Sequence, residues 1–313
     1  MDGNGDVLAR VLAGETRAIA RLMSRVEGRS GDVAELMAEI HKHAGRAHVI
    51  GLTGVPGSGK STLVHAMAKA LRASGRTVGI VAVDPSSPYS GGAILGDRVR
   101  MSDLATDEGV FIRSLATRGA LGGLARAALD TVDVLDAAGF DVVLIETVGV
   151  GQDEVDIAEA AETVLVVSAP GLGDGIQAIK AGVLEIADIH VVSKCDKEES
   201  SRTVADLKSM LHLGSTARHR YGWEVPVLRT SAETSLGIDD LICALDAHRK
   251  HLIDSGERII RRRRILEMRI LKTAEDLLRQ RVGQGDALSK VVESSLAGNL
   301  SPRQAAEALL KTL

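Results

Sequence analysis

The chain has 313 residues, which is enough for one α/β core of about 200 residues with further elements attached. Charged residues make up 26% of the chain and the formal net charge is −4, so no broad basic field is available for a nucleic-acid partner. Aromatic residues reach only 2%, so the core must be built from Val, Ile, Leu and Ala.

No apolar stretch approaches the ~18 residues of a membrane span, and the N-terminal sequence lacks the basic start and apolar core of a signal peptide. We therefore expect a cytoplasmic protein with no membrane partner. Cys195 and Cys243 have no metal-ligand spacing, and we expect both to be reduced thiols.

Three regions follow one another along the chain. Residues 1–45 and 256–313 carry apolar residues at helical spacing, which predicts N- and C-terminal helical extensions. Residues 46–255 alternate short apolar runs with helical stretches, a pattern typical of βαβ units and of an α/β fold with a mostly parallel central sheet flanked by helices. The predicted strands are Val49–Val55, Val78–Asp84, Val110–Leu115, Asp141–Val148, Thr163–Ala169, Ile189–Lys194 and Val225–Ser231.

The first strand leads into Gly54–Ser61, which fits the phosphate-loop pattern G-x-x-x-x-G-K-[ST] and predicts a P-loop NTPase. Its glycines let successive N–H groups point at phosphate oxygens, and the following helix N-terminus adds partial positive charge. We expect Lys60 to bridge the β- and γ-phosphates as a catalytic residue and the Ser61 hydroxyl to ligate Mg²⁺. The predicted nucleotide contacts here are Gly54, Val55, Pro56, Gly57, Ser58, Gly59, Lys60, Ser61 and Thr62.

Two acids stand at the carboxyl ends of apolar strands, where ligands bind in open α/β sheets. Asp84 closes the second predicted strand, and Glu146 lies near the end of the fourth, in the pattern Glu-x-x-Gly149. We expect both carboxylates near Mg²⁺, with Glu146 also in a catalytic role, and the Gly149 N–H near the γ-phosphate. Asp97, in a Gly-rich loop after the second strand, is a further candidate metal ligand.

The predicted strand Ile189–Lys194 leads into the sequence Ser193-Lys194-Cys195-Asp196. This sequence is close to the N-K-x-D pattern with which GTPases recognise guanine. A buried Asp196 would accept from guanine N1–H and the 2-amino group, which adenine cannot supply, while the Lys194 stem packs along the base. Ser193 replaces the usual Asn and is shorter, so we expect guanine preference to survive through Asp196 with weaker binding.

A second base-binding segment is predicted after the next strand. Ser231, Ala232 and Glu233 resemble the Ser-Ala element whose backbone N–H contacts guanine O6. Together with Asp196, this segment indicates GTP rather than ATP.

In the C-terminal region an apolar stripe is expected to pack on the core or to meet another subunit. It consists of Ile260, Leu266, Ile270, Ala274, Leu277 and Leu278. We interpret the run Arg261–Arg264, at the start of the same helix, as a solvated face. Gly283-Gln-Gly285 is expected to end that helix, and Ser301-Pro302 to cap and begin the last one.

Further motifs occur in order over roughly residues 45–255. With the phosphate loop, they resemble the MeaB-like branch of the G3E GTPases, which includes the MMAA-like chaperones of methylmalonyl-CoA mutase and the proteins once called LAO/AO transport kinases. The motifs are Asp84-Pro-Ser-Ser-Pro88, Ser90-Gly-Gly, Gly96-Asp97-Arg98-Val-Arg100-Met101, Phe111-Ile-Arg113-Ser114, Arg118-Gly119, Gly122-Gly123-Leu124, Glu146–Gln152 and Gly171–Asp188.

The resemblance implies a G-protein chaperone for an adenosylcobalamin-dependent acyl-CoA mutase, coupling GTP binding and hydrolysis to loading of intact cofactor and removal of damaged cofactor. It implies Mg²⁺ with GTP or GDP, and adenosylcobalamin only through the partner mutase. The resemblance also implies that four residues surround Mg²⁺ as its ligands: Ser61, Asp84, Asp97 and Glu146. It also implies a homodimer joined through the C-terminal helices.

The segment Asp174–Lys180 resembles the family's third switch. The resemblance implies that Gln177 and Lys180 approach the nucleotide as catalytic residues when the mutase is bound. Gly175 departs from the pattern, because relatives often carry an acidic residue there.

We expect the reaction GTP + H₂O → GDP + phosphate, catalysed by positioning and electrostatic stabilisation. No general base is evident, so turnover is expected to be slow alone and stimulated by the partner. Two alternatives stay open: a metallochaperone GTPase delivering a metal ion, and an ATP-dependent kinase of a transport system. The first normally presents clustered His or Cys, whereas we interpret His41, His43 and His48 as a solvated polar turn.

Overall fold

The computed structural model describes residues 4–28, 33–84, 101, 103–116, 126–147, 159–170, 185–197, 199–213, 219–220, 222–283 and 286–312. The chain divides into two compact units, Met1–Arg262 and Arg263–Leu313. The division falls within helix α13 (Glu257–Gly283), whose first residues belong to the larger unit. The boundaries predicted at residues 45/46 and 255/256 stay predictions.

Seven strands form one sheet in the order β3-β2-β4-β1-β5-β6-β9, with every neighbouring pair parallel. Strands β1, β4, β5 and β6 are buried at every residue, because helices cover both faces of a parallel sheet. The predicted sheet is thus confirmed, and its carboxyl ends share one edge. The strands are β1 (His48–Thr53), β2 (Val78–Asp84), β3 (Val110–Ala116), β4 (Val142–Thr147), β5 (Thr163–Ser168), β6 (Ile189–Val192) and β9 (Val227–Arg229).

The last predicted strand, Val225–Ser231, is only partly correct. Just three of its residues form β9, and a short antiparallel hairpin of β7 (His219–Arg220) and β8 (Trp223–Glu224) precedes it. Two-residue strands are too short to carry an alternating apolar pattern, so this hairpin could not be predicted from the spacing of apolar residues.

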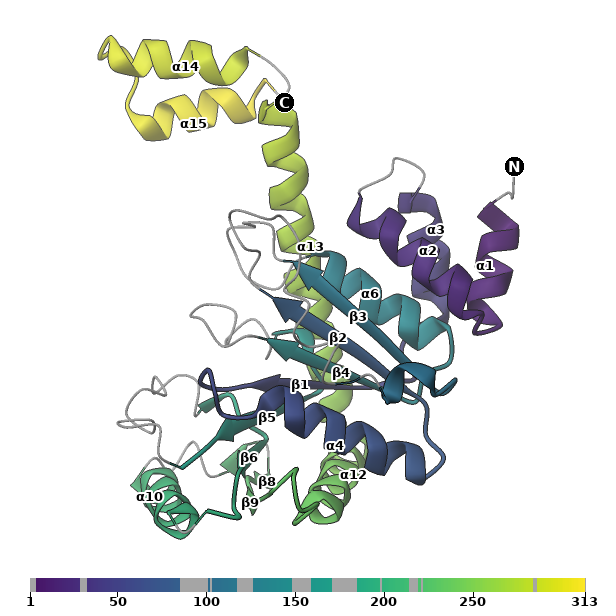
Figure 1. Cartoon of the computed structure of the whole chain (residues 1–313). Coiled ribbons are helices and arrows are strands. Elements are labelled where there is room, and N and C mark those ends of the chain that lie inside the picture. The colour runs from purple at the N-terminus through teal and green to yellow at the C-terminus, as the bar shows by residue number, and fades with distance from the viewer. Residues whose placement is uncertain are drawn as a thin grey trace. The chain divides into compact units, whose positions relative to one another are not determined.

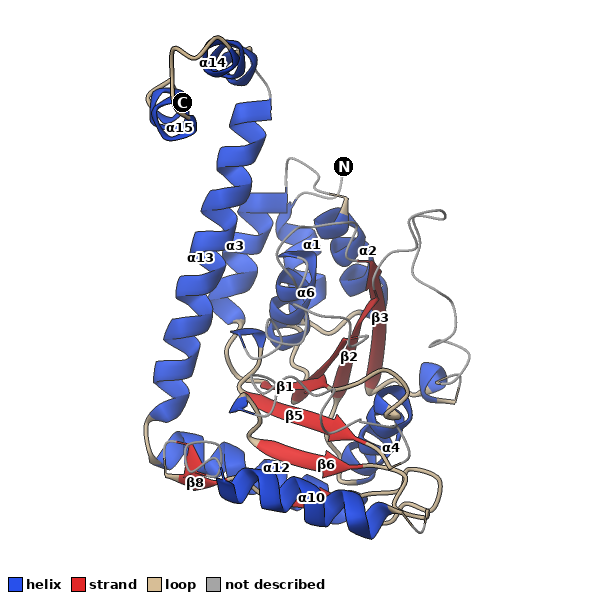
Figure 2. Ribbon diagram, turned by 90° about the vertical axis from the view of Figure 1, so that its left-hand side faces the viewer, coloured by secondary structure: helices blue, strands red, loops and turns tan. Residues whose placement is uncertain are grey.

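Helices α4 (Lys60–Ala73) and α12 (Ile238–Asp254) contact each other and cover one face of the sheet (Figure 1). Their apolar stripes meet alternate strand residues such as Leu52, Ile80 and Leu144 in the main core. Helix α10 (Ser200–Leu213) lies beside β6 and β9, and a 3₁₀ turn, η1 (Leu104–Thr106), precedes β3. Figure 2 shows the same layers from the side.

Helix α6 (Arg126–Ala137) covers the other face and is itself covered by α1 (Asn4–Leu12), α2 (Thr16–Glu27) and α3 (Val33–His43). Residues 131–137 of α6 are all buried, because sheet and N-terminal helices enclose it. Near its end, the Asp136 carboxylate accepts backbone N–H groups of Gly45, Arg46 and Ala47 at 2.6, 2.9 and 3.0 Å. The turn into β1 is therefore bonded to α6.

The smaller unit holds most of α13, with α14 (Ala287–Leu296) and α15 (Pro302–Leu310) packed on each other. Helix α13 ends at Gly283, and Ser301 caps α15 with Pro302 as its first residue, as the sequence predicted. The structure adds a capping box between Ser301 and Gln304. All six residues of the predicted apolar stripe are exposed: Ile260, Leu266, Ile270, Ala274, Leu277 and Leu278. No helix in the described part of the chain is long and apolar enough to span a bilayer.

Candidate nucleotide-binding site

The phosphate loop has the backbone geometry that its glycines predict. Gly54, Gly57 and Gly59 have φ values of +136°, +78° and +86°, which side-chain-bearing residues rarely adopt. A Cβ on Gly54 would also lie 2.1 Å from the Val167 carbonyl oxygen of β5. Helix α4 begins directly after Gly59 with no side-chain cap and no acid in its first turn. Its first N–H groups are thus suited to an anionic ligand.

Lys60 lies inside this loop. Its ammonium donates to the carbonyl oxygens of Gly54 at 2.7 Å and Val55 at 3.2 Å, and the residue is only 6% exposed. The positive charge is therefore held at the position where phosphate oxygens are predicted to lie.

Two predicted metal ligands converge from different elements. The Ser61 hydroxyl donates to Glu146 Oε1 at 2.6 Å, and Glu146, near the end of β4, is 4% exposed. The pairing of Leu52 with Glu146 across β1 and β4 brings the carboxylate beside the start of α4. A hydroxyl and a carboxylate oxygen are hard donors of the kind Mg²⁺ prefers, so these residues fit the ion.

The other sequence-predicted residues around the phosphates are less fully described. Asp84 is the last residue of β2 and pairs with Ala116 of β3, which places its backbone at the same sheet edge. Asp97, Gly149, Gln177 and Lys180 lie outside the described residues. Their predicted contacts stay predictions.

The chain that follows the predicted Asp97 loop is tied to α4. Asp103 contacts Lys69 at 2.6 Å and His65 at 2.7 Å, while Asp107 pairs with Arg72 at 2.9 Å. The Lys69 ammonium, followed by His65, holds the pKa of the Asp103 carboxyl well below its usual range. The segment that contains Asp103 and Asp107 is thus attached to the helix that carries Lys60 and Ser61.

The predicted base-reading segment contacts the phosphate loop directly. The Ser193 hydroxyl lies 2.5 Å from the Ser58 carbonyl oxygen and 3.1 Å from that of Ser168. Lys194, with φ of +54°, donates to the Gly57 carbonyl oxygen at 2.7 Å. Ser193 therefore links the two segments despite being shorter than the usual Asn.

Asp196 is exposed, so any burial of its carboxylate must come from the base. The pKa of the Asp196 carboxyl is lowered, first by the nearby Ser231 hydroxyl and then by the backbone N–H of Asp196 itself. The carboxyl therefore stays ionised and can accept hydrogen bonds. The Ser231 oxygen makes no hydrogen bond of ordinary geometry within the described residues. The Cys195 N–H donates to Thr230 O at 3.0 Å, joining the two predicted base segments, whereas Glu233 is exposed and Ala232 partly buried.

Several buried hydroxyl oxygens at the carboxyl edge of the sheet have no hydrogen-bond partner in the described part of the chain. Leaving such a group unpaired costs about 1–3 kcal/mol, so a cluster of them indicates a polar ligand. Four were missed by the sequence prediction, although each lies at the end of a strand: Thr53 ends β1, Thr147 ends β4, Ser168 ends β5 and Thr230 directly follows β9. The full set is Thr53, Ser58, Thr147, Ser168 and Thr230, together with Ser231, whose hydroxyl lies near the Asp196 carboxylate without a hydrogen bond of ordinary geometry.

The predicted histidine turn is wrong in one respect. His48 begins β1, is 1% exposed and contacts the Thr163 hydroxyl at 2.7 Å, so it is not solvated. His41 lies apart, 3.4 Å from Asp133. Over the described residues, no group of three or more His, Cys, Asp and Glu side chains is arranged to hold a metal.

The fold and the site together define a P-loop nucleotide-binding protein. A parallel sheet carries the glycine loop, the Lys60 ammonium and the Ser61–Glu146 pair on one edge. The family model for methylmalonyl Co-A mutase-associated GTPase MeaB matches residues 17–287, and the chain belongs to this family.

Two individual relatives are similar to this protein over nearly the whole chain. A protein of Pyrococcus abyssi that is named as a GTPase is 42% identical over 311 residues, covering 98% of this chain and 96% of the relative. The crystal structure of an LAO/AO transport system kinase has a TM-score of 0.73 and 28% identity, covering 99% of this chain and 97% of that chain. The crystal structure of HypB from Helicobacter pylori in complex with nickel has a TM-score of 0.50 and 19% identity over 70% of this chain and 94% of that chain, which shows the fold alone.

Proposed function

We propose that this protein hydrolyses GTP and acts as a G-protein chaperone for an adenosylcobalamin-dependent acyl-CoA mutase of the methylmalonyl-CoA mutase type. The observation that carries the guanine assignment is the contact of Ser193 and Lys194 with the phosphate loop, which brings the Asp196 segment beside the phosphates. Family membership supports the mutase as partner, because the family is described by its association with that enzyme.

Catalysis in this proposal is electrostatic. The N–H groups at the start of α4 and the Lys60 ammonium stabilise charge on the transferring phosphoryl group. Ser61 and Glu146, with Asp84 and Asp97, would hold Mg²⁺, which supplies further positive charge to the β- and γ-phosphate oxygens when bound. Because no residue stands out as a general base, turnover is slow until the mutase brings Gln177 and Lys180 to the nucleotide.

The first experiment is titration with Mg²⁺-GDP and Mg²⁺-ADP, in the wild type and in Asp196→Ala. Micromolar GDP binding that ADP does not match, and that the variant loses, supports guanine recognition. Asp206→Ala is the matched control, because this exposed acid lies on α10. Equal binding of both nucleotides would overturn the guanine assignment.

The reaction and partner are tested separately. Release of free phosphate supports hydrolysis, whereas label on an acceptor would favour the kinase alternative. Nucleotide-dependent co-elution with a purified methylmalonyl-CoA mutase supports the chaperone role. Stoichiometric Ni²⁺ or Zn²⁺ binding in equilibrium dialysis would favour the metallochaperone alternative instead.

We also propose that two copies associate through the C-terminal helices. The exposed apolar side chains of the smaller unit include Ile270 at 58% and Leu277 at 52%, a pattern typical of a protein contact. Sedimentation of Ile270→Asp combined with Leu277→Asp is expected to give a monomer. Arg281→Asp, a charge change at an already polar position of α13, is expected to stay a dimer. A monomeric wild type would contradict the proposal.

A further inference from the structure

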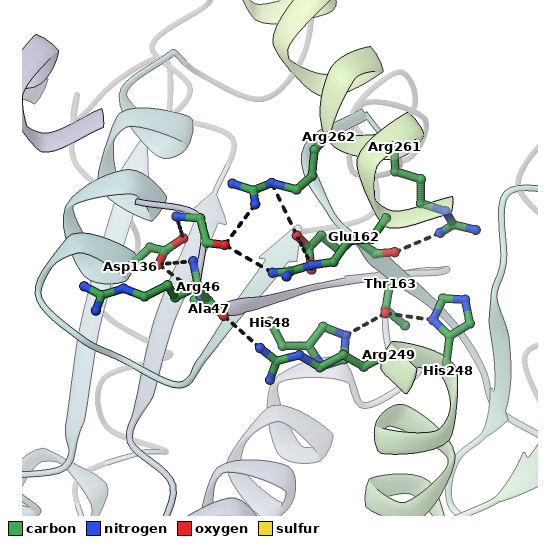
Figure 3. Close-up of polar contacts among 12 residues, drawn as sticks. Arg46, Ala47, His48, Asp136, Glu162, Thr163, His248, Arg249, Arg261 and Arg262 are labelled. Atoms are coloured by element: carbon green, nitrogen blue, oxygen red, sulfur yellow. Dashed lines mark hydrogen bonds and ion pairs between the residues drawn. The ribbon is translucent and has the colours of Figure 1, made fainter. Parts of the chain in front are cut away.

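The amino-terminal edge of the sheet, opposite the phosphate loop, holds a largely buried polar cluster. Figure 3 shows part of it, including His48, Glu162, Thr163, His248 and Arg261. We call it the edge cluster. Its members come from the beginnings of β1, β5 and β6 and from the helices α12 and α13. They are His48, Glu162, Thr163, Asp188, His248, Arg258 and Arg261.

Arg261 is the link from α13. Its guanidinium binds Asp188 in a bidentate arrangement, with Nη1–Oδ2 at 2.7 Å and Nη2–Oδ1 at 2.8 Å, and Nη1 also donates to Glu162 O at 2.8 Å. Arg261 is 8% exposed and Asp188 is fully buried. The interpretation of residues 261–264 as a solvated face is therefore wrong for Arg261. A planar fork held by two oxygens allows one orientation, so the first turns of α13 are fixed on the strands.

Asp188 also fixes its surroundings. Its carboxylate accepts Val164 N–H of β5 at 2.9 Å, and its backbone carbonyl accepts the Trp223 indole N–H of the β7–β8 hairpin at 2.8 Å. Trp223 packs against His248 with ring centroids 4.9 Å apart. One residue thus joins β6 to β5, to the hairpin and to α13.

Thr163 extends the cluster to β1. Its hydroxyl lies 2.7 Å from His48 Nε2 and 2.9 Å from His248 Nδ1, so β1, β5 and α12 meet at one oxygen. Arg258 reaches both carboxylate oxygens of the neighbouring Glu162 at 3.1 Å. The three strands and two helices therefore share a continuous set of contacts.

Each strand that starts in the edge cluster ends in the nucleotide site. β1 leads into the phosphate loop, β5 ends at Ser168, whose carbonyl lies beside the Ser193 hydroxyl, and β6 leads into Ser193 itself. From Asp188 to Ser193 is five residues, or about 16 Å of extended chain. These strands are hydrogen-bonded along their length, so a shift at one end moves the other.

We propose that Arg261 and Asp188 are positioning residues for guanine binding, through which the first turns of α13 and the nucleotide site influence one another. The inference rests on the guanine assignment above. Linkage is reciprocal, so if the edge cluster sets nucleotide affinity, nucleotide binding must alter the edge cluster by the same free energy.

The wild-type protein offers a direct test, because Trp223 is the only tryptophan in the chain and lies in contact with Asp188 and His248. GDP with Mg²⁺ is expected to change the emission of Trp223 saturably, with a midpoint equal to the calorimetric Kd. Asp196→Ala should lose both signals together. Trp223 emission that stays constant while calorimetry records GDP binding would overturn the inference and leave the guanine assignment intact.

Variants test the same link from the other end. Arg261→Met is expected to weaken GDP binding at least ~5-fold and to reduce the preference for GDP over inosine diphosphate, which lacks the 2-amino group. Arg261→Lys, which keeps the charge but not the fork, should recover part of the loss. Arg263→Met is the matched control, because that neighbouring arginine is exposed and pairs only with Glu267 in the described structure.

Circular dichroism and thermal melting establish that each variant is folded at the titration temperature. Lower stability alone leaves the GDP-to-inosine-diphosphate ratio of a folded protein unchanged, so a changed ratio separates positioning from a merely structural role. A folded Arg261→Met protein with wild-type affinity and ratio would overturn the inference. Absence of guanine binding by the wild type would remove the proposed function and this inference together.

Discussion

The Ser193 hydroxyl lies 2.5 Å from the Ser58 carbonyl oxygen, across 135 positions of sequence. Ser58 is fully buried and its carbonyl faces away from solvent, so this contact holds the base segment on the phosphate loop. The shorter side chain at this position does not separate the two segments.

Replacing Ser193 by Ala is therefore expected to weaken GDP binding about tenfold. The reason is that without this bond the base segment is no longer held on the phosphate loop, so nucleotide binding has to order it, and a cost of about 1.4 kcal/mol corresponds to tenfold in Kd. Calorimetric titration measures the change. The control is Ser255→Ala, which removes a comparable hydroxyl–carbonyl bond to His251 at the end of α12. Equal affinities for wild type and Ser193→Ala would contradict this account.

Gly54→Ala is expected to destabilise the protein by about 3 kcal/mol and to abolish nucleotide binding. The new methyl would meet the Val167 carbonyl oxygen at 2.1 Å, and φ of +136° is unfavourable for alanine. The thermal midpoint should fall by about 6 to 12 °C.

Gly75→Ala is the control for conformational strain alone. Gly75 has φ of +83°, but a Cβ there meets no atom within 4 Å. Its cost should be about 1 kcal/mol, with nucleotide affinity unchanged. Equal losses in both variants would mean that close approach of β5 does not constrain Gly54.

Glu146→Gln is expected to remove most of the Mg²⁺ dependence of GTP binding. The amide keeps the size of the side chain and its contact with Ser61 but loses the charge that favours a divalent cation. Titration of GTP with and without EDTA should give a large difference for the wild type and a small one for the variant. A variant that responds to EDTA as the wild type does would exclude Glu146 from the metal site.

Folding stability is expected to fall as the pH drops below about 6.5, with His48 as one cause. Burial, followed by the Arg249 charge, holds the pKa of His48 well below its usual value, so the unfolded chain binds a proton before the folded protein does. The contribution is fully present above pH ~6.5 and is lost below it with a slope of up to about 1.4 kcal/mol per pH unit.

Urea unfolding at pH 7.5, 6.5 and 5.5 measures this slope, and His48→Gln should flatten it while keeping a partner for Thr163. Burial raises the pKa of Glu162, which stabilises the folded state as pH falls, but Glu162 is present in both proteins and cancels in the comparison. Identical slopes would show that His48 is not the residue that titrates.

The sheet could be predicted from the sequence because its strands are continuous apolar runs. β2 matches its prediction residue for residue, and β1, β4 and β5 differ by one or two positions at their ends. The phosphate loop could also be predicted from the sequence, since all its residues lie within one short motif. In both cases the determining interactions are local.

The contacts that join distant segments could not be predicted in this way. Arg261 meets Asp188 across 73 positions, and a run of four arginines reads the same whether it is solvated or buried. His48 likewise looked like part of a polar turn, because its partner Thr163 is 115 positions away. The spacing of residues along the chain does not indicate which distant residues will be in contact.

The three backbone bonds to Asp136 have a consequence for any shortened form of the protein. A chain beginning at residue 46 would lose one of those donors, Gly45 N–H, together with the helices that cover α6. The surface of α6 that α2 covers would then be exposed to solvent. In the intact chain Ile19, Leu22 and Met23 of α2 are fully buried. Such a fragment would expose a large apolar patch and aggregate, so the N-terminal helices must be expressed together with the nucleotide-binding core.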